Sequence, residues 1–332
     1  MKKEVIIGIL STLIIVIAGC TQVRESTLRQ TQQPQDCLLL EDRMTITNED
    51  INYGDNTVFI CRNWYSLPNG IVIDGDDLIV NLNGAILEGI GEHDGVRLKG
   101  NDVTVENGEI KNYFKGISAE SIVAPEGVAT ISRNTILNAL YGIWVVSSNP
   151  SLSGTLVEAN EILNASNGIY LNSNAITISN NEIAARYSGI WVDGYPEGAT
   201  RNIVQGNTIN MDYYGTGVRV SSADNNIVRF NTIDGAYSGI QLYCTFGNCP
   251  DNNDITQNVI RNSDGWGIYI ESGSNDNDFV GNTITNSLRA DFYCSGALGN
   301  MFLNNRCNTI ESDDCVPPPN CIRVVKGEQV EI

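Results

Sequence analysis

Hydrophobic and polar positions repeat along most of the chain with a period of about 25 residues, which is typical of a solenoid. Each repeat contains short runs in which apolar and polar residues alternate, as in Gly189–Asp193, and this is the periodicity of β-strands. No stretch between these runs is long enough for a helix. Three short strands per repeat cannot bury their apolar sides alone, so successive repeats must stack to close a core and pair their backbone groups.

A four-residue motif marks each repeat and predicts a tight turn. Its second position is Gly in two copies and Asn in the next eight, and its fourth position is Ile nine times and Cys once. Gly and Asn best tolerate a left-handed backbone, so we expect a positive φ at the second position and stacked Asn amides between repeats. The fourth position is expected to point into the core. The copies begin at Asn83, Asn107, Arg133, Ala159, Asn180, Gly206, Phe230, Gln257, Gly281 and Asn304.

A second marker, Gly followed by Ile or Val, opens another strand soon after most of these turns. Alternate residues of this strand point away from the core. Many of the outward residues are aromatic, so most of the Trp and Tyr side chains gather on one side of the predicted solenoid. The outward column consists of Arg97, Ser118, Trp144, Tyr170, Trp191, Arg219, Gln241, Tyr269 and Tyr293.

These patterns predict an all-β fold, a single parallel β-helix of about ten rungs with three strands per rung and capped ends. Right-handed coiling is the default for parallel crossovers. The repeats resemble the right-handed parallel β-helix repeat proteins of the pectin-lyase-like superfamily, and in style the NosD-like proteins, over about residues 61–310. The resemblance implies the fold. It does not imply an activity, because that superfamily contains lyases, hydrolases, epimerases and adhesins.

The N-terminus has the layout of an export signal. A basic start precedes an apolar run that ends at Cys20 in a segment resembling a prokaryotic lipoprotein cleavage site, so we expect Cys20 to be lipidated and the protein to be anchored outside the cytoplasm. An uncleaved N-terminal anchor is the alternative. The predicted organisation is a signal peptide at 1–19, a lipid-anchored flexible tether at 20–36, an N-terminal cap at 37–68, the β-helix at 69–307, and a C-terminal cap and tail at 308–332.

Charge and cysteine content narrow the possible ligands and the compartment in which the protein works. A formal net charge of −19 argues against nucleic acid, or an anionic glycan held by bulk electrostatics, although a local basic site is compatible with it. Apart from Cys20, the Cys residues are even in number, as expected for disulfides in an oxidising compartment. Metal binding is disfavoured because the spacings are not zinc-like. We expect Cys37 to pair with Cys61 and Cys244 with Cys249, and three pairings are open for Cys294, Cys307, Cys315 and Cys321.

The aromatic column suggests a binding surface for a polysaccharide or surface glycan, since sugar rings stack on aromatic faces while their hydroxyls form hydrogen bonds. In this hypothesis the side chains of three consecutive rungs form a flat platform, with charged groups at one end and loop aromatics beside it. The alternative is that the rings only stack along the sheet and stiffen it. The expected ligand-binding residues are Trp144, Tyr170, Trp191, Arg219, Asp193, Tyr187 and Tyr214.

The sequence favours a binding protein over an enzyme. Hydrolysis needs two carboxylates about 5–10 Å apart, and the weak catalytic candidates are Asp193, Arg219 and Asp212, the last only if its loop approaches Asp193. The alternatives are a polysaccharide lyase or glycoside hydrolase acting on the same face, or a non-catalytic structural surface protein. His93, the only His, is expected to be an exposed loop residue without a catalytic role.

Acidic residues also recur in the loop before the first strand of several repeats. Stacked Asx side chains at such a corner would cap backbone groups, or their oxygens would bind Ca²⁺. The first is the favoured interpretation. No cofactor is expected, and the weak Ca²⁺ candidates are Asp224, Asp254 and Asp278. The oligomeric state is open.

Overall fold

A computed structural model describes residues 36–121, 128–147, 154–196, 198–212, 214–316, 319–325 and 328–331. The chain divides after Gln33, and the unit from Pro34 to Ile332 holds all of these residues. The predicted signal peptide, Cys20 and nearly all of the predicted tether lie outside the described residues. No helix among the described residues is long and apolar enough to cross a membrane.

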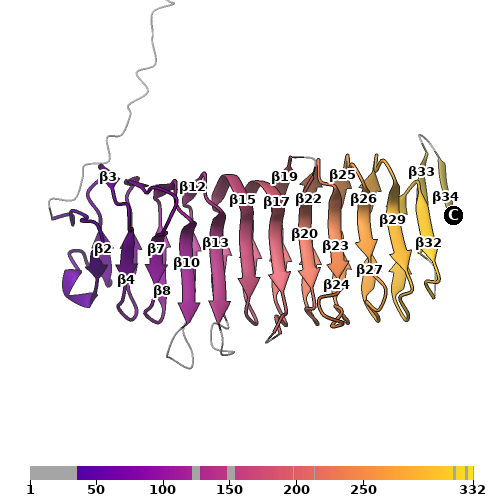
Figure 1. The fold of residues 1–332 in the computed structure, drawn as a ribbon, viewed down its shortest axis with the longest axis horizontal. Helices are drawn as coiled ribbons and strands as arrows, with labels where there is room; N and C mark the ends of the chain where they lie inside the picture. Colours follow the sequence, from indigo (N-terminus) through magenta and orange to yellow (C-terminus); the bar gives the residue numbers. More distant parts are fainter. Residues whose placement is uncertain are drawn as a thin grey trace, which may run out of the picture. The chain divides into compact units, whose positions relative to one another are not determined.

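This unit is a parallel β-helix in which each rung contributes three short strands (Figure 1). One rung consists of β18 (Ile203–Gln205), β19 (Thr208–Met211) and β20 (Thr216–Ser221). The next rung repeats this order and pairs with it in parallel, strand for strand. Equivalent strands therefore stack into three sheets, named sheets 1, 2 and 3 in the order in which the chain visits them.

Sheet 1 is 11-stranded and contains, besides β18, the strands β2 (Thr57–Phe59), β5 (Ile79–Asn81), β8 (Val103–Glu106), β11 (Ala129–Ser132), β14 (Leu156–Glu158), β16 (Thr177–Ser179), β21 (Ile227–Arg229), β24 (Asp254–Thr256), β27 (Asp278–Val280) and β30 (Met301–Leu303). Sheet 2 contains β19 and the strands β3 (Trp64–Ser66), β6 (Ile86–Glu88), β9 (Glu109–Lys111), β12 (Thr135–Leu137), β22 (Thr232–Asp234), β25 (Val259–Arg261), β28 (Thr283–Thr285), β31 (Arg306–Cys307) and β33 (Ile322–Val325).

Sheet 3 contains β20 and the strands β1 (Thr45–Ile46), β4 (Ile71–Ile73), β7 (Asp94–Leu98), β10 (Lys115–Ser121), β13 (Tyr141–Ser147), β23 (Ser238–Tyr243), β26 (Trp266–Ile270), β29 (Ala290–Ser295) and β32 (Ile310–Asp313). In the middle of the solenoid the second and third strands of a rung run together, so β15 (Glu161–Asn172) and β17 (Glu182–Asp193) belong to both sheets 2 and 3.

Parallel pairing extends beyond the predicted limits of 69–307 at both ends. β1, β2 and β3 already pair with strands of the following rung, although they lie within the segment predicted as a cap. A 3₁₀ helix, η1 (Asn48–Asp50), lies between β1 and β2. At the other end β33 pairs with β31, and β34 (Glu328–Glu331) folds back antiparallel to β33. The antiparallel strand ends the parallel array.

The core consists of stacked aliphatic columns. The Ile residues at the fourth motif position from Ile110 to Ile284 are completely buried, as predicted. The Gly that opens the strands of sheet 3 is required by the close approach of neighbouring rungs. A Cβ at Gly142 would lie 2.5 Å from Cγ2 of Ile162 and 2.6 Å from the carbonyl oxygen of Gly168. A side chain at this position would therefore collide with both the core and the backbone of the next rung.

The left-handed residue of each turn is the first motif position, so the expectation of a positive φ at the Asn position is wrong. Arg133, Ala159 and Phe230 have φ angles of 55°, 53° and 57° although each carries a side chain. Only the copy at Asn83 has a second left-handed residue, Gly84. The Asn that follows is instead buried. Its recurrence at the second motif position of successive repeats therefore has a cause other than the backbone conformation.

That cause is a hydrogen-bonded ladder of amides, which confirms the predicted stacking. The Oδ1 of Asn207 accepts hydrogen bonds from the backbone N and the Nδ2 of Asn181, at 2.9 and 3.0 Å. Asn207 makes the same two bonds to Oδ1 of Asn231, and its Nδ2 also donates to the carbonyl of Ile178 at 3.1 Å. The ladder comprises Asn134, Asn160, Asn181, Asn207, Asn231, Asn258, Asn282 and Asn305.

Four disulfides link the remaining cysteines. The predicted pairs Cys37–Cys61 and Cys244–Cys249 are confirmed. Of the three pairings open for the other four residues, the structure has Cys294–Cys315 and Cys307–Cys321. Three of the four disulfides therefore lie in the first or last rungs, and Cys244–Cys249 closes a loop that follows β23.

Candidate functional site

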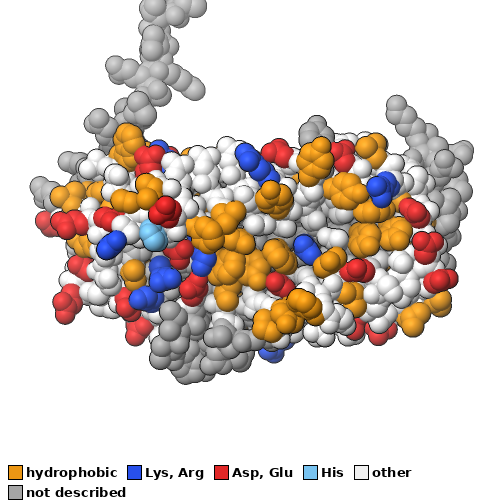
Figure 2. Space-filling view, viewed as in Figure 1, with side chains coloured by type: hydrophobic (Ala, Val, Ile, Leu, Met, Phe, Trp, Pro, Cys, Tyr) orange, Lys and Arg blue, Asp and Glu red, His pale blue; other side chains and the backbone are white. Residues whose placement is uncertain are grey.

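The outward column of sheet 3 lies in the predicted register. Trp144, Tyr170, Trp191 and Arg219 are successive partners on β13, β15, β17 and β20. Gln241, Tyr269 and Tyr293 continue the same column. These side chains are half-buried, and Figure 2 shows hydrophobic side chains gathered on the face formed by these strands.

The rings do not form the flat platform that was expected. Trp144 and Tyr170 stack face to face, with centroids 4.1 Å apart and planes 18° apart, whereas Trp191 meets Tyr170 edge-on at 5.1 Å and 89°. Side chains that project from rungs about 4.8 Å apart are at the right spacing to cover one another's faces. The other side of this group is occupied by the ammonium of Lys115, 4.6 Å from the Trp144 ring. Ring edges and polar tips, not open faces, are therefore available to a ligand.

Arg219 lies between two rings at the end of this stack. Its guanidinium carbon is 5.0 Å from the Trp191 centroid and 4.3 Å from that of Tyr243. The Nε of Arg219 and the neighbouring Nε1 of Trp191 are buried without a hydrogen-bond partner among the described residues. Burial lowers the pKa of Arg219, and the charges of nearby acidic groups, Asp193 among them, oppose this effect.

Asp193 is fixed by two hydrogen bonds. Its Oδ2 accepts from the phenol of Tyr170 at 2.9 Å, and its Oδ1 accepts from the backbone N of Tyr195 at 3.2 Å. Burial, followed by the charge of Asp193, raises the pKa of Tyr170. Asp193 and Arg219 thus lie near each other, but within the described residues no ion pair joins them.

Asp212 does not approach Asp193. Its backbone N bonds to the carbonyl of Ala185, near the middle of β17, whereas Asp193 is the last residue of that strand. At about 3.3 Å per residue the two carboxylates lie at opposite edges of sheet 3. The expectation that the loop would bring them together is therefore wrong, because β20 separates the corner that holds Asp212 from the strand end that holds Asp193.

Exposed aromatic side chains flank the column. Tyr187 and Tyr214, predicted as ligand-binding residues, are 66% and 89% exposed near the edge where the strands of sheet 3 begin. At the opposite edge Tyr195 packs against Phe246, with centroids 4.9 Å apart, and Phe246 is 83% exposed. Sequence reasoning missed this second pair because it lies in loops that follow the strands, outside the repeated pattern.

A second aromatic group continues the column toward the C-terminus. Tyr269 and Tyr293 are stacked with centroids 5.0 Å apart, and Trp266 lies 4.9 Å from Tyr269. The guanidinium carbon of Arg289 is 4.7 Å from the Trp266 ring. The Nε1 of Trp266 is another buried donor without a partner in the described part of the chain. Aromatic groups therefore lie on both sides of Arg219 along one column.

A network of charged groups lies at the other end of the column. The ammonium of Lys115 is 2.5 Å from Glu120 and 4.0 Å from Asp94, and Arg97 lies 3.7 Å from each of these carboxylates. Ser118 donates a 2.7 Å hydrogen bond to Asp94. Sequence reasoning missed this network because its members come from β7 and β10 and meet only when the rungs stack.

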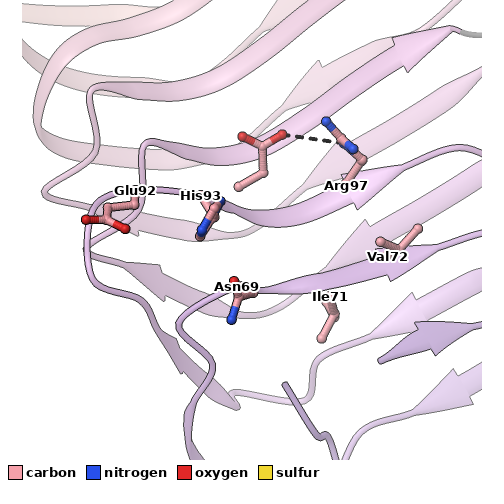
Figure 3. Close-up of a pocket in the computed structure, with 7 residues that line it drawn as sticks. Asn69, Ile71, Val72, Glu92, His93 and Arg97 are labelled. Carbon is pink, nitrogen blue, oxygen red and sulfur yellow. Dashed lines mark ion pairs between the residues drawn. The ribbon is translucent and has the colours of Figure 1, made fainter. Parts of the chain in front are cut away.

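A hollow of about 180 Å³ lies beside this network (Figure 3). His93 and Arg97 face it from β7 and the preceding loop, and Asn69 and β4 form its other side. His93 is an exposed loop residue, as expected. The amide of Asn69 is already occupied by Asp42 and Arg43. The lining comprises Asn69, Ile71, Val72, Glu92, His93, Asp94 and Arg97.

The Asx residues before sheet 1 cap the backbone, as favoured from the sequence. Oδ1 of Asp224 accepts a 2.8 Å hydrogen bond from the backbone N of Asp251. A second amide ladder runs through Asn202, Asn226, Asn253, Asn277 and Asn300.

The three calcium candidates do not form one group. Asp224 lies at this corner, whereas Asp254 and Asp278 are neighbours on β24 and β27. No group of three or more His, Cys, Asp or Glu side chains suited to a metal occurs among the described residues.

Comparison with known proteins agrees with this architecture. Residues 151–307 match the family described as right handed beta helix region. The fold is a right-handed parallel β-helix. No curated protein sequence matches this β-helix.

Solved structures that share the fold have low sequence identity to this chain. The Dettilon tailspike protein superposes with a TM-score of 0.57 at 15% identity over 79% of this chain and 55% of its own. The catalytic unit of a GH87 α-1,3-glucanase from Streptomyces thermodiastaticus gives 0.51 at 16% identity, over 84% and 60%. A double mutant of the periplasmic alginate epimerase AlgG gives 0.50 at 14% identity, over 84% and 74%. The β-helix thus spans only about half the length of the tailspike chain.

Proposed function

We propose that this β-helix binds a polysaccharide or surface glycan along the outer side of sheet 3. The observation that carries the proposal is the column in which Arg219 lies between two aromatic groups. One group consists of Trp144, Tyr170 and Trp191, and the other of Trp266, Tyr269 and Tyr293. Apolar ring edges interleaved with a guanidinium and with tyrosine side chains suit a sugar chain, which offers C–H surfaces and hydroxyl groups.

Rigid presentation supports the same proposal. Stacking fixes the rings before a ligand arrives, so little side-chain entropy is lost on binding. Exposed Tyr187, Tyr214 and Phe246 stand beside the column, where they would contact the flanks of a bound chain. The similar glucanase and epimerase structures carry the names of polysaccharide substrates, which is consistent with a glycan ligand although the likeness itself concerns the fold.

Anchoring outside the cytoplasm belongs to the same proposal and rests on the sequence alone. The apolar N-terminal run ending at Cys20 would place the face next to cell-surface polymers. Disulfides at both ends of the solenoid are in keeping with an oxidising compartment.

Hydrolysis of a polysaccharide is the second candidate function. One observation favours it, in the charged network of β7 and β10 and not in the aromatic column. Asp94 and Glu120 both contact the ammonium of Lys115, at 4.0 and 2.5 Å, so two carboxylates lie close together as glycoside hydrolysis requires. The hollow lined by His93 and Arg97 lies next to them. This candidate is tested by incubating the chain from Cys37 onward with surface polysaccharides and following the release of reducing ends, for the parent and for Asp94→Asn.

The binding proposal is tested with the chain from Cys37 onward, screened on a glycan array and then titrated with the best ligand. Replacing Trp144 and Trp191 together by Ala should weaken binding by about tenfold or more, since aromatic contacts contribute roughly 0.5–1.5 kcal/mol each beyond burial. Phe230→Ala is the matched control, because Phe230 is 54% exposed and lies at the turn between sheets 1 and 2. Unchanged affinity in the double variant, with an intact circular dichroism spectrum, would show that the rings only stiffen the sheet.

A further inference from the structure

The Arg219 guanidinium is a fixed cation without a counter-ion. It is held between Trp191 and Tyr243, its Nε is buried and unpaired, and no ion pair to it occurs among the described residues. Leaving a half-buried charge unpaired is unfavourable, because desolvation is not offset by a partner. An anion that approached the terminal amino groups of Arg219 would supply the missing partner.

Neighbouring carboxylates bond to other groups and form no ion pair with Arg219 among the described residues. Asp193 accepts hydrogen bonds from Tyr170 and from the backbone of Tyr195. Glu271 accepts a 2.6 Å hydrogen bond from the backbone N of Cys244. Both acidic groups are near enough to influence Arg219 electrostatically, yet their hydrogen bonds go to Tyr170, Tyr195 and Cys244 rather than to Arg219.

The other cations of sheet 3 differ from Arg219. Lys115 and Arg97 are ion-paired with Asp94 and Glu120, and Arg289 is exposed to solvent. Arg219 thus combines partial burial with the lack of an ion pair. A guanidinium is also the cation best suited to bind a carboxylate through two parallel hydrogen bonds.

We propose that Arg219 binds the carboxylate of an isolated acidic sugar in a glycan whose other residues, lying over the aromatic groups on either side, are uncharged. The inference rests on the glycan-binding function proposed above and specifies its ligand. The neutral flanks follow from the part of the column between Trp144 and Tyr293. It spans six register steps of about 4.8 Å, and Arg219 is the one cation among its seven residues.

A chain with an acid on every sugar does not fit this face. Asp193 and Glu271 flank Arg219, Glu120 lies farther along the sheet, and the protein as a whole carries a formal charge of −19. Additional carboxylates along the chain would face these groups and be repelled. One carboxylate at Arg219, with uncharged residues on both sides, avoids the repulsion and pairs the cation.

The test compares three probes by calorimetric titration: neutral dextran oligosaccharides, oligogalacturonate with an acid on every residue, and deacylated gellan oligosaccharides, in which neutral sugars separate the uronates. Gellan oligosaccharides should bind most tightly. Arg219→Gln should weaken their binding about tenfold or more and remove most of its salt dependence, because a charge-assisted hydrogen bond is lost. Arg261→Gln, an exposed Arg of sheet 2, is the control and should leave binding unchanged.

Each other result overturns the inference in a recognisable way. Equal or tighter binding of oligogalacturonate would contradict the isolated acid, and unchanged gellan binding by Arg219→Gln would contradict the role of Arg219. If dextran binds as well as gellan while the Trp144 and Trp191 double variant loses both, the binding face stands and the acidic ligand is wrong. If no probe and no array glycan binds, both the acidic ligand and the proposed glycan-binding function are wrong.

Discussion

The phenol of Tyr170 donates a 2.9 Å hydrogen bond to the carboxylate of Asp193 on the next rung. This bond joins the aromatic stack to the strand end that precedes Tyr195, so the position of the acid depends on a ring one rung away. Tyr170→Phe keeps the ring and removes the bond. The free energy of unfolding should fall by about 1.5–3 kcal/mol, as expected for a hydrogen bond to a charged group. Chemical denaturation measures it, and Tyr187→Phe, at an exposed site, should show no change.

The Asn ladder should make a large contribution to stability. Asn207→Leu would leave the backbone N of Asn181 buried without an acceptor and would remove one donor to the carbonyl of Ile178, at a cost of about 1–3 kcal/mol for the unpaired N–H. We expect a clear fall in melting temperature. Asn210→Ala, at an exposed position of β19, is the control and should change stability by less than about 0.5 kcal/mol. Equal melting temperatures for the two variants would contradict the ladder.

The left-handed position of the turn predicts opposite effects of two small substitutions. Gly206→Ala places a side chain at a φ of 66° and puts its Cβ 2.7 Å from Oδ1 of Asn180, so stability should fall by about 1 kcal/mol or more. Ala159→Gly relieves a φ of 53° and should not lower stability. Thermal unfolding of both variants decides the point, with Ala184→Gly, a strand position, expected to be destabilising.

Asp278 predicts a pH dependence of stability. Burial and the charge of Asp254 on the adjacent rung raise the pKa of Asp278. A carboxyl group with a raised pKa binds its proton more tightly in the folded state than in the unfolded state. Its contribution to stability is therefore fully present below the pKa of the unfolded state and is lost as the pH rises through the pKa of the folded state. Asp278→Asn should therefore raise the melting temperature at neutral pH, and the gain should disappear well below the ordinary value of 3.8.

The matched control for this pH dependence is Asp212→Asn, which removes one acidic charge at an exposed position. It should change the melting temperature little at either pH. A gain for Asp278→Asn that is equally large in acid would contradict the assigned cause, because the parent carboxyl is then protonated and uncharged.

Membrane attachment should depend on Cys20. Cys20→Ser removes the thiol that would carry the lipid, so labelled fatty acid should not be incorporated and the protein should leave the membrane fraction or stay unprocessed. Metabolic labelling of parent and variant measures this directly. Equal labelling in both would leave an uncleaved N-terminal anchor as the better account.

The fold could be predicted because its determinants are local and repeated. Stacking copies of one short pattern leaves few alternatives, and this placed Ile183 in the core and Trp191 on the outside correctly. The turn was misassigned for a physical reason. Gly and Asn share a tolerance for positive φ, but the Asn of the motif is retained for its buried amide, and residues as different as Arg133 and Phe230 adopt the left-handed conformation.

The site was less predictable because it depends on contacts between rungs. Sequence placed Trp144 and Tyr170 in one column, but whether their rings lie side by side or face to face depends on side-chain torsions that carry no sequence signal. The pairing of Lys115 with Asp94 joins residues of successive rungs. Arg219 could be named as a candidate, whereas its lack of an ion pair became visible only with its neighbours in place.

The disulfides at the two ends determine where such a molecule begins to fray. A terminal rung has only one neighbour, so opening of a linear array should start there and proceed inward. Cys37–Cys61 ties the first rung shut, and Cys294–Cys315 with Cys307–Cys321 tie the last. With these disulfides intact, the terminal rungs should no longer open before the inner ones. Reduction of the disulfides would let the terminal rungs open first again, so the redox potential of the surroundings would determine how many rungs stay closed.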